Sequence, residues 1–463
     1  MKKISLFFLS LILISTGAMA KDFDYGDALK KSFLFYEAQR SGKKETDKYI
    51  YKLNWPKSSA LDDGKDNGVD LSGGWYDAGD YVKFGLPMAY SASMTGWSIL
   101  LSPEAFKELK LYDYAKSNLK YVLDYFLKAY KIKKNIKDDI FFYQVGDPAI
   151  DHKYWMSAED INYQRSSFYC TSSSPCSEVS AQTAAALAIG YLVFKNSDKD
   201  YADTLLTRAK RLYLFSKTFQ GNSGYKMAKG AYDSSGYIDE LSYSALWLYI
   251  ATKEKKYLLD AVNFASKLDK DDIYWPLNWG DMQNSVFLLL AILTDKPLYH
   301  NLVQQHLNHW IHKEKRTKGG LVFADKWGSL QYAANLAFTA LVYADFVPSE
   351  SKKQEYISFA KSQIDYILGK NPRQSSYLIG FGRNFPKNPH HANAHHSKTD
   401  DIDVPKNNTY ELTGAMVGGP KSLDDFDYED KRDDYIANEV SISYNAGLIP
   451  ALVKLYILFN KSK

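Results

Sequence analysis

This chain of 463 residues has only two cysteines, little excess charge and almost no long apolar runs. Its 58 Lys and Arg nearly balance its 54 Asp and Glu, which leaves a formal net charge of +4. Because charges of both signs alternate along the chain, the sequence does not indicate binding to nucleic acid or to an acidic membrane surface. A neutral binding partner fits this composition better.

The apolar run that stands out is at the start of the chain. Lys2 and Lys3 precede the apolar residues 4–14, and small residues follow up to Ala20, which is the layout of a cleaved secretory signal. We expect residues 1–20 to be removed and the protein to be secreted, into the extracellular space or the periplasm. This run is too short to span a bilayer, and no later stretch is expected to be long and uncharged enough to do so.

Cysteine is confined to Cys170 and Cys176, which lie close together in a serine-rich stretch. Two cysteines alone are a poor zinc site. In an oxidising compartment the simpler interpretation is a disulfide that closes a short surface loop.

No linker rich in Pro, Gly or Ser divides residues 21–463, which favours a single large domain. Helical periodicity recurs in about twelve segments of this domain. The first is capped by Asp24 and ends at Gly42, and the others cover 89–101, 111–131, 179–195, 200–217, 237–252, 255–268, 283–294, 299–312, 329–345, 352–368 and 435–459. Long polar and aromatic loops separate alternate pairs, which predicts an all-α (α/α)6 toroid with a cleft across one end.

A glycine-rich turn holds two aspartates, Asp77 and Asp80, in the stretch Gly73-Gly74-Trp75-Tyr76-Asp77-Ala78-Gly79-Asp80. Carboxylates at this spacing can point toward one spot, where a water molecule is held and deprotonated. Turns of this kind also bind calcium or cap the next helix, so the stretch alone leaves these alternatives open.

Glu439 stands among apolar and amide neighbours in Ile436-Ala437-Asn438-Glu439-Val440, within the predicted final helix. Such surroundings raise a carboxyl pKa enough for the group to act as an acid. Alone, it is an ordinary helix glutamate. Together with a distant turn that holds water, it meets the requirement of inverting glycoside hydrolysis, in which base and acid stand on opposite sides of the sugar.

Both stretches resemble characteristic blocks of glycoside hydrolase family nine, and further matches follow in order along the chain. Residues 25–29 and 35–42 resemble the family's first helix, 145–155 a substrate-lining loop, 234–241 its calcium loop, 319–330 a cleft segment and 376–391 its histidine block. The resemblance therefore runs through the whole of the expected mature chain.

The resemblance implies roles for individual residues. Asp80 corresponds to the catalytic base, Asp77 to a residue that helps to hold the water, and Glu439 to the catalytic acid. The residues that would contact the sugar are His152, Trp155, Trp275, Trp327, His390 and Tyr444. A tryptophan in a helical protein also serves as core, so the three tryptophans keep that alternative.

Three positions depart from the family pattern. Ala392 and Gln331 stand where the family usually has arginine, and Tyr81 stands where it has histidine. Alanine cannot replace the charge-assisted hydrogen bonds of a guanidinium, so the level of activity and the substrate length are open. The nearby cations that could substitute are His395, His396 and Lys398.

Two metal interpretations arise from the sequence. The run from His390 to His396 contains four imidazoles, which can bind zinc or nickel, but the resemblance explains the first pair without a metal. A structural calcium ion is expected instead, and no cofactor is expected for the chemistry. The predicted calcium ligands are Ser235, Gly236, Asp239 and Glu240, with Asp281 completing the set.

These observations predict a monomeric, endo-acting and inverting hydrolase of β-1,4-glucan, with no nucleic-acid or membrane partner. An exo-acting cellodextrinase is one alternative. A β-glucan-binding protein with weakened catalysis is another, which the missing arginines favour. Retention of Asp77, Asp80 and Glu439 argues against the weakened protein.

Overall fold

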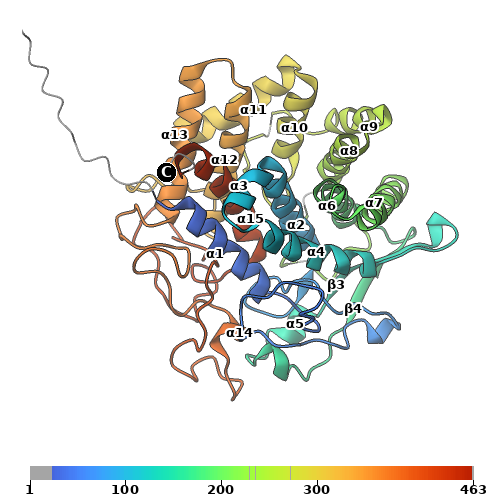
Figure 1. Ribbon diagram of the computed structural model, residues 1–463, viewed down its shortest axis with the longest axis vertical. Coiled ribbons are helices and arrows are strands. Elements are labelled where there is room, and N and C mark those ends of the chain that lie inside the picture. The colour runs from blue at the N-terminus through green and yellow to red at the C-terminus, as the bar shows by residue number, and fades with distance from the viewer. Residues whose placement is uncertain (1–22, 229, 235, 272, 461–463) are drawn as a thin grey trace, which may run out of the picture.

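The computed structural model describes residues 23–460 except 229, 235 and 272 (Figure 1). The expected signal peptide, residues 1–20, and the predicted calcium ligand Ser235 lie outside the described residues.

Helices dominate the described part of the chain, and twelve of them have 11 or more residues. These are α1 (Tyr25–Ala38), α2 (Gly85–Leu101), α4 (Tyr112–Ala129), α6 (Ser177–Phe194), α7 (Lys199–Thr218), α8 (Ile238–Thr252), α9 (Lys255–Ala265), α10 (Gln283–Thr294), α11 (Pro297–His312), α12 (Ser329–Tyr343), α13 (Glu350–Ile367) and α15 (Ile442–Leu455). Three short helices, α3 (Pro103–Glu108), α5 (Pro148–Asp151) and α14 (Ala392–His395), lie in the connections.

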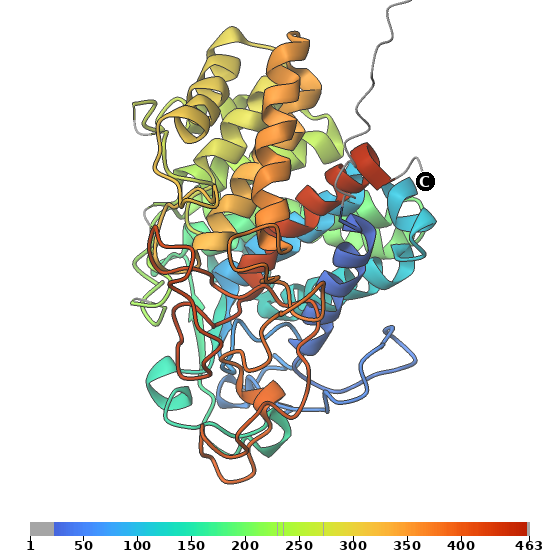
Figure 2. The same cartoon turned by 90° about the vertical axis from the view of Figure 1, so that its left-hand side faces the viewer.

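The long helices form two layers (Figures 1 and 2). In the inner layer α2 contacts α6, α6 contacts α8, and the series continues through α10, α12 and α15 back to α2. The other six pack outside this ring, and each outer helix precedes an inner one along the chain. This arrangement confirms the predicted all-α (α/α)6 toroid.

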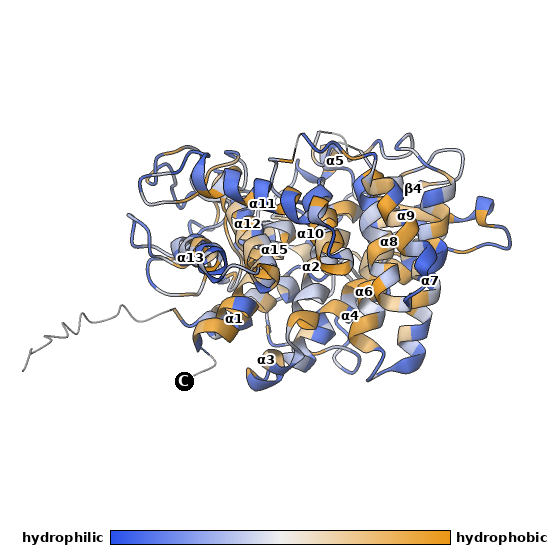
Figure 3. Cartoon of the chain, turned by 90° about the horizontal axis from the view of Figure 1, so that it is seen from above, coloured by the Kyte–Doolittle hydropathy of each residue, from blue (hydrophilic) through white to orange (hydrophobic). Residues whose placement is uncertain are grey.

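Burial explains why the two layers have different sequences (Figure 3). All 15 residues of α12 are buried, because protein surrounds an inner helix on every side. The outer helix α7 buries only 7 of its 20 residues and keeps a polar face. Small residues bring the inner helices close together. A Cβ atom on Gly447 of α15 would lie 1.8 Å from Oδ1 of Asn335 on α12.

The long connections all lie at one end of the toroid, along the left-hand and lower sides of Figure 2. Each runs from an outer helix to the start of the next inner helix, whereas the connections from inner to outer helices are short. The long ones cover 39–84, 130–176, 219–237, 266–282, 313–328 and 368–441, and the short ones cover 102–111, 195–198, 253–254, 295–296 and 344–349. The amino ends of the inner helices therefore carry nearly all of the irregular chain.

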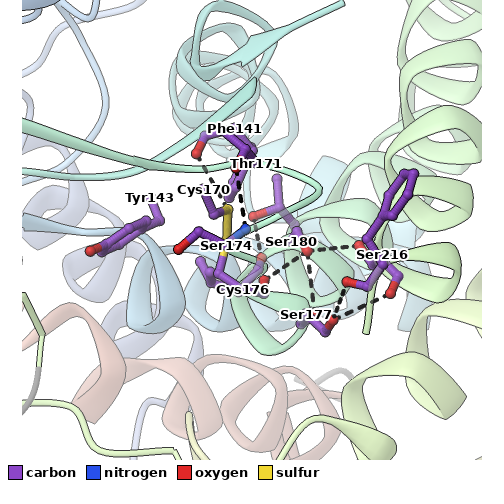
Figure 4. The surroundings of a disulfide bond; sticks show 12 residues. Phe141, Tyr143, Cys170, Thr171, Ser174, Cys176, Ser177, Ser180 and Ser216 are labelled. Atoms are coloured by element: carbon purple, nitrogen blue, oxygen red, sulfur yellow. Dashed lines mark hydrogen bonds between the residues drawn. A yellow bond between two sulfur atoms is a disulfide. The ribbon is translucent and has the colours of Figure 1, made fainter. Parts of the chain in front are cut away.

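A small antiparallel sheet, which the sequence analysis did not predict, lies among these loops. Its strands are β1 (Lys83–Phe84), β2 (Tyr130–Lys131), β3 (Ile140–Val145) and β4 (Ser167–Cys170), and β3 pairs with each of the other three. A disulfide joins Cys170, at the end of β4, to Cys176, just before α6 (Figure 4). The sheet thus connects the Asp77–Asp80 turn, which precedes β1, to the loop that follows β3.

Two expectations about the C-terminal segment are wrong. The helix predicted over 435–459 begins only at Ile442, because the residues before it form backbone bridges, His390 to Glu439 and Val417 to Val440. Glu439 is therefore not a helix residue. Ile442–Asn460 also proves long and apolar enough, by composition, to cross a membrane. Its apolar window is 78% buried within this protein, as befits an inner helix of the ring.

The two ends of the described chain meet at the end of the toroid remote from the long loops. The backbone N–H of Tyr25 donates to Oδ1 of Asn460 at 2.9 Å. The side-chain amide of Asn460 donates in turn to the carbonyl of Phe23 at 3.2 Å.

Candidate active site

Backbone hydrogen bonds fix the Asp77–Asp80 turn against the C-terminal loops. The N–H of Ile442 donates to the carbonyl of Asp77 at 2.9 Å, and the N–H of Ala392 donates to that of Gly79 at 2.8 Å. A Cβ atom on Gly79 would lie 2.2 Å from the carbonyl oxygen of His390, so this close approach requires glycine. Segments that are far apart in the sequence thus meet at the turn.

Asp80 and Asp77 have different surroundings within the turn. Nε2 of His152 lies 3.0 Å from Oδ2 of Asp80, and this hydrogen bond raises the pKa of His152. Asp77 is buried, and Oδ2 of its carboxyl group accepts a hydrogen bond from the hydroxyl of Tyr232. Burial, and then the charge of Asp80, raises the pKa of Asp77. Asp77 therefore binds a proton more readily than usual, while Asp80 has His152 as its hydrogen-bond partner.

Glu439 faces the turn from the segment before α15. Its backbone carbonyl accepts from the N–H of Gly418 at 2.9 Å, and its backbone forms a parallel bridge with His390. Burial raises the pKa of Glu439, and the charges of Asp80 and Asp77 raise it further. A carboxyl group in this setting keeps its proton at a pH where an ordinary glutamate is ionised, so it is suited to act as an acid.

Aromatic rings extend from this group of carboxylates. The rings of Trp155 and His390 are 4.6 Å apart, those of His390 and Tyr435 are 6.2 Å apart, and those of Tyr435 and Trp327 are 5.8 Å apart. The indole N–H of Trp155 donates to Nδ1 of His395 at 2.7 Å, which fixes its plane. The contacts thus form a continuous aromatic row.

Trp275 and Trp327 are exposed by 41% and 44%, which is unusual for so large an apolar side chain. Trp275 packs edge-on against Tyr332 at 5.3 Å. Tyr444 is buried, and burial, followed by the charge of Glu439, raises its hydroxyl pKa. The two exposed tryptophans are not core residues, and they present flat surfaces to solvent.

The structure also accounts for Ala392, which stands at one of the family's arginine positions. Its side chain is 2% exposed and packs in a small apolar cluster with Tyr76, Tyr81 and Ala158. The hydroxyl of Tyr81 donates to the carbonyl of Met156 at 2.7 Å. No room for a longer side chain remains between these rings without movement.

The three cations considered as substitutes are engaged elsewhere. Both ring nitrogens of His395 are hydrogen-bonded, to Trp155 and to the carbonyl of Pro405, and burial lowers its pKa. His396 is hydrogen-bonded to Ser157. Lys398 pairs with Asp160 at 2.8 Å. Gln331, at the other arginine position, is buried beside Gly328 and Tyr444.

The histidine run is a hydrogen-bonding element. Nδ1 of His391 accepts from the N–H of Ala394 at 2.9 Å, and its Nε2 lies 2.7 Å from Oε1 of Gln39. Burial lowers the pKa of His391 to about 3, so this ring is neutral. Nδ1 of His390 lies 2.6 Å from the carbonyl of Arg432, to which it donates. These contacts explain the histidines without a metal ion.

The predicted calcium loop contains a buried acidic pair. Glu240 is fully buried, and neither of its carboxyl oxygens has a hydrogen-bond partner in the described part of the chain. Oδ2 of Asp239 accepts from the N–H of Met282 at 2.7 Å, next to Asp281. Oxygen atoms that lack donors are what a hard cation requires, so Asp239 and Glu240 fit calcium.

Sequence reasoning missed three side chains that contact the site. Tyr232 hydrogen-bonds Asp77, Gln39 donates to the carbonyls of Tyr76 and Ala78, and Asp151 accepts from the N–H of Tyr81. Gln39 and Asp151 both lie within stretches that resemble the family, next to residues that were singled out. Tyr232 lies in an irregular loop, and no periodicity or motif marks it.

Comparison with known proteins agrees with this geometry. The family model for glycosyl hydrolase family 9 matches residues 25–452. Endoglucanase A of Bacillus pumilus is 42% identical to this chain, over 97% of the chain and 69% of that protein. The structure of an endoglucanase from the termite Nasutitermes takasagoensis superimposes with a TM-score of 0.87 at 38% identity, covering 94% of this chain and 99% of that one.

Endoglucanase CelQ from Clostridium thermocellum, complexed with cellotriose, superimposes with a TM-score of 0.86 at 39% identity, covering 94% of this chain and 71% of that one. With the family match extending from α1 into α15, the chain belongs to glycosyl hydrolase family 9.

Proposed function

We propose that this glycoside hydrolase cuts internal β-1,4 bonds of glucan with inversion of the anomeric carbon. The observation that carries this proposal is the convergence of Asp77, Asp80 and Glu439 at one end of the toroid, where backbone hydrogen bonds hold them together. The similar proteins are named endoglucanases, and one of them is complexed with cellotriose. These names support a glucan as the substrate.

The reaction follows from the different environments of the three carboxyl groups. Asp80 acts as the base and removes a proton from a water molecule that Asp77 helps to hold. The water oxygen bonds to the anomeric carbon as the bond to the glycosidic oxygen breaks. Glu439 gives its proton to that oxygen, so the leaving sugar departs as a neutral alcohol. Because water attacks from the side opposite the leaving group, the new hydroxyl has the α configuration.

Side chains around the carboxylates position the sugar. His152, His390 and Tyr444 lie beside the reacting groups and present polar atoms there. Trp155, Trp275 and Trp327 offer ring faces on which the apolar faces of glucose units stack.

The weakened binding protein is the second candidate, and the surroundings of Ala392 disfavour it. An arginine lost without repair would leave a gap, but apolar contacts with Tyr76, Tyr81 and Ala158 fill this position. The site has been rebuilt around a small residue. The replacement of arginine by Ala392 is expected to affect the length of glucan that the enzyme prefers. An exo-acting cellodextrinase, which prefers short oligosaccharides, is therefore the alternative.

We also propose that the enzyme is exported as a monomer and carries a structural calcium ion. The layout of residues 1–20 supports export. Asp239 and Glu240 would hold the ion, together with Asp281 and the carbonyl of Gly236. A bound calcium ion supplies charge compensation for the buried pair and takes no part in bond cleavage.

The mode of cleavage is tested with soluble polymer and with an oligosaccharide. We expect carboxymethylcellulose to lose viscosity well before much reducing sugar appears, because internal cuts shorten chains quickly. Proton NMR of fresh cellotetraose products should show the α-anomer first. Early β-anomer would exclude inversion, and reducing sugar without loss of viscosity would show exo action.

The catalytic assignment is tested with Asp80→Asn and Glu439→Gln. Each variant removes an acid or a base without changing shape, so kcat is expected to fall on the order of 10³-fold. Circular dichroism and the melting temperature should stay close to those of the wild type. Asp160→Asn, which changes an exposed carboxylate paired with Lys398, is the control and should retain full activity. Near-normal turnover in either catalytic variant would rule out its assignment.

Restoring the arginine as Ala392→Arg is expected to destabilise the fold by about 1–3 kcal/mol, because it overpacks a filled site. It is also expected to lower kcat/KM on cellotetraose, because the backbone of Ala392 is bonded to Gly79, next to Asp80. The melting temperature should fall as well. Ala392→Ser, which adds only one atom, is the control for polarity. A rise in kcat/KM at an unchanged melting temperature would show instead that the arginine is a missing catalytic feature.

Calcium is expected to raise the melting temperature of chelator-treated protein. Saturation at 100 times Kd corresponds to about 2.7 kcal/mol of stabilisation if the ion binds only the folded state. The shift should disappear in Asp239→Ala. It should persist in Asp295→Ala, which removes a fully exposed carboxylate at the far end of α10. Identical melting curves with and without millimolar calcium in the wild type would contradict the proposed ion.

A further inference from the structure

A buried row of four alternating charges lies behind the base. Nζ of Lys83 is 2.6 Å from Oδ2 of Asp63, and Nε of Arg165 is 2.7 Å from Oδ1 of the same carboxylate. Nη1 of Arg165 is 3.6 Å from Oδ2 of Asp151. The side-chain exposure of the four is 0%, 1%, 6% and 3% in the order Lys83, Asp63, Arg165, Asp151, so solvent screens none of these contacts strongly.

The inner end of this row anchors the loop. Nζ of Lys83 also donates to the carbonyls of Leu71 and Gly73, at 2.7 and 3.0 Å. These bonds hold the chain just before the Asp77–Asp80 turn. They account for Lys83 and Asp63 as structural residues.

The outer end of the row, Asp151, lies beside the proposed base, Asp80. Oδ1 of Asp151 accepts from the N–H of Tyr81, the residue that follows Asp80, at 3.1 Å. His152, the residue that follows Asp151, is hydrogen-bonded to Asp80. One oxygen or nitrogen atom from each of Asp80, Asp151 and His152 lies within 4.8 Å of the others. Asp151 therefore fixes the backbone beside the base and places a second negative charge next to it.

Two like charges at this distance in a buried setting repel each other strongly unless cations or donors compensate for them. Burial, and then the charge of Asp80, raises the pKa of Asp151 to about 6. Arg165 and the hydroxyl of Tyr163, which donates to Oδ2 of Asp151 at 2.6 Å, oppose that rise. The charge state of Asp151 thus depends on Arg165, and it acts on the base across less than 5 Å.

We propose that Asp151 and Arg165 are positioning residues for the base, and that this pair sets the pH at which activity is lost on the acid side. The inference rests on the proposed role of Asp80. Asp151 orients the backbone and His152 around the base, and its negative charge makes Asp80 a stronger proton acceptor. Arg165 offsets part of the negative charge that gathers at Asp151 and Asp80, and the Lys83–Asp63 pair holds Arg165 in place.

Several other groups face these carboxylates. Those around Asp80 are Asp77, Asp151, His152, His390, His391 and Glu439, and those around Asp151 are Asp80, Tyr163 and Arg165. Substitution of Asp151 or Arg165 leaves the other members of both sets in place, so a change in the pH profile reports on the pair.

The experiment is the pH dependence of kcat and KM on cellotetraose for purified full-length variants. Asp151→Asn keeps an oxygen acceptor for the N–H of Tyr81 but removes one negative charge beside Asp80. The base then releases its proton more easily, so the acid limb of kcat should move to lower pH by about one unit. The weaker base should also lower kcat at the optimum by about tenfold, with little change in KM.

Arg165→Gln provides the opposite charge change. Loss of the cation leaves Asp63 and Asp151 less compensated, so nearby carboxyl groups hold their protons more tightly and the acid limb should move to higher pH. Arg165→Lys keeps the charge, and its limb should return toward that of the wild type. A purely structural role predicts lower stability in all three variants without limb shifts of opposite sign.

A matched control is available outside the row of charges and the groups around Asp80. The carboxyl group of Asp139 is also buried, and it accepts hydrogen bonds from the hydroxyl of Tyr130, from the backbone N–H of Lys133 and from Arg211. Asp139→Asn therefore removes a carboxylate with the same kinds of partner. Its melting temperature should fall, while kcat and the acid limb stay as in the wild type.

The outcomes separate this inference from the proposed function. An unmoved acid limb in Asp151→Asn overturns the inference, whatever happens to kcat. If Asp151→Asn does not fold, a limb in Arg165→Gln that stays in place or moves to lower pH overturns it equally. If Asp80→Asn retains activity, the base assignment itself fails, and this result does not depend on Asp151 or Arg165.

Discussion

The arrangement of the proposed catalytic carboxylates depends on a few backbone hydrogen bonds between segments that are more than 300 residues apart. The carbonyls of Asp77 and Gly79 accept from the N–H groups of Ile442 and Ala392, and the absence of a Cβ atom on Gly79 lets the chains touch. Backbone bonds of this kind do not depend on side-chain rotamers, so they fix the turn more firmly than ion pairs could. The ring of inner helices supplies a rigid base for them, and every carboxylate of the site sits on chain that this base holds in place.

Much of this arrangement could be predicted from the sequence, for identifiable physical reasons. Inner helices have apolar residues on all sides, whereas outer helices have them on one face. Helical periodicity therefore located nearly all of the twelve long helices. The start of α15 could not be located, because residues 436–440 mix apolar and polar side chains that suit an extended segment as well as a helix. Backbone pairing of Glu439 with His390 and of Val440 with Val417 decides for the extended segment. The resemblance indicated the three carboxylates that the proposed reaction uses. The contact of Tyr232 with Asp77 could not be predicted, because only folding brings the loop of Tyr232 to Asp77.

Environment, rather than residue type, separates the proposed roles of the three carboxyl groups. Burial favours the protonated form of Asp77 and of Glu439, whereas Asp80 has His152 as its hydrogen-bond partner. Three carboxyl groups in identical surroundings would have the same pKa. One of them could then not stay protonated as an acid while another stays ionised as a base. The row of buried charges follows the same principle. The charges of Lys83, Asp63, Arg165 and Asp151 sum to zero, and their order places the negative end, Asp151, nearest to Asp80.

The contact between the two ends of the described residues, Phe23 and Asn460, has a consequence for the topology of the protein. Asn460 bonds to both Phe23 and Tyr25, so a short peptide could join the ends and turn the catalytic chain into a closed loop. New ends could then be opened in one of the short inner-to-outer connections, such as 253–254, on the same side of the toroid. The fold is thus suited to circular permutation, and a module fused at either the old or the new ends would hang on the side away from the substrate.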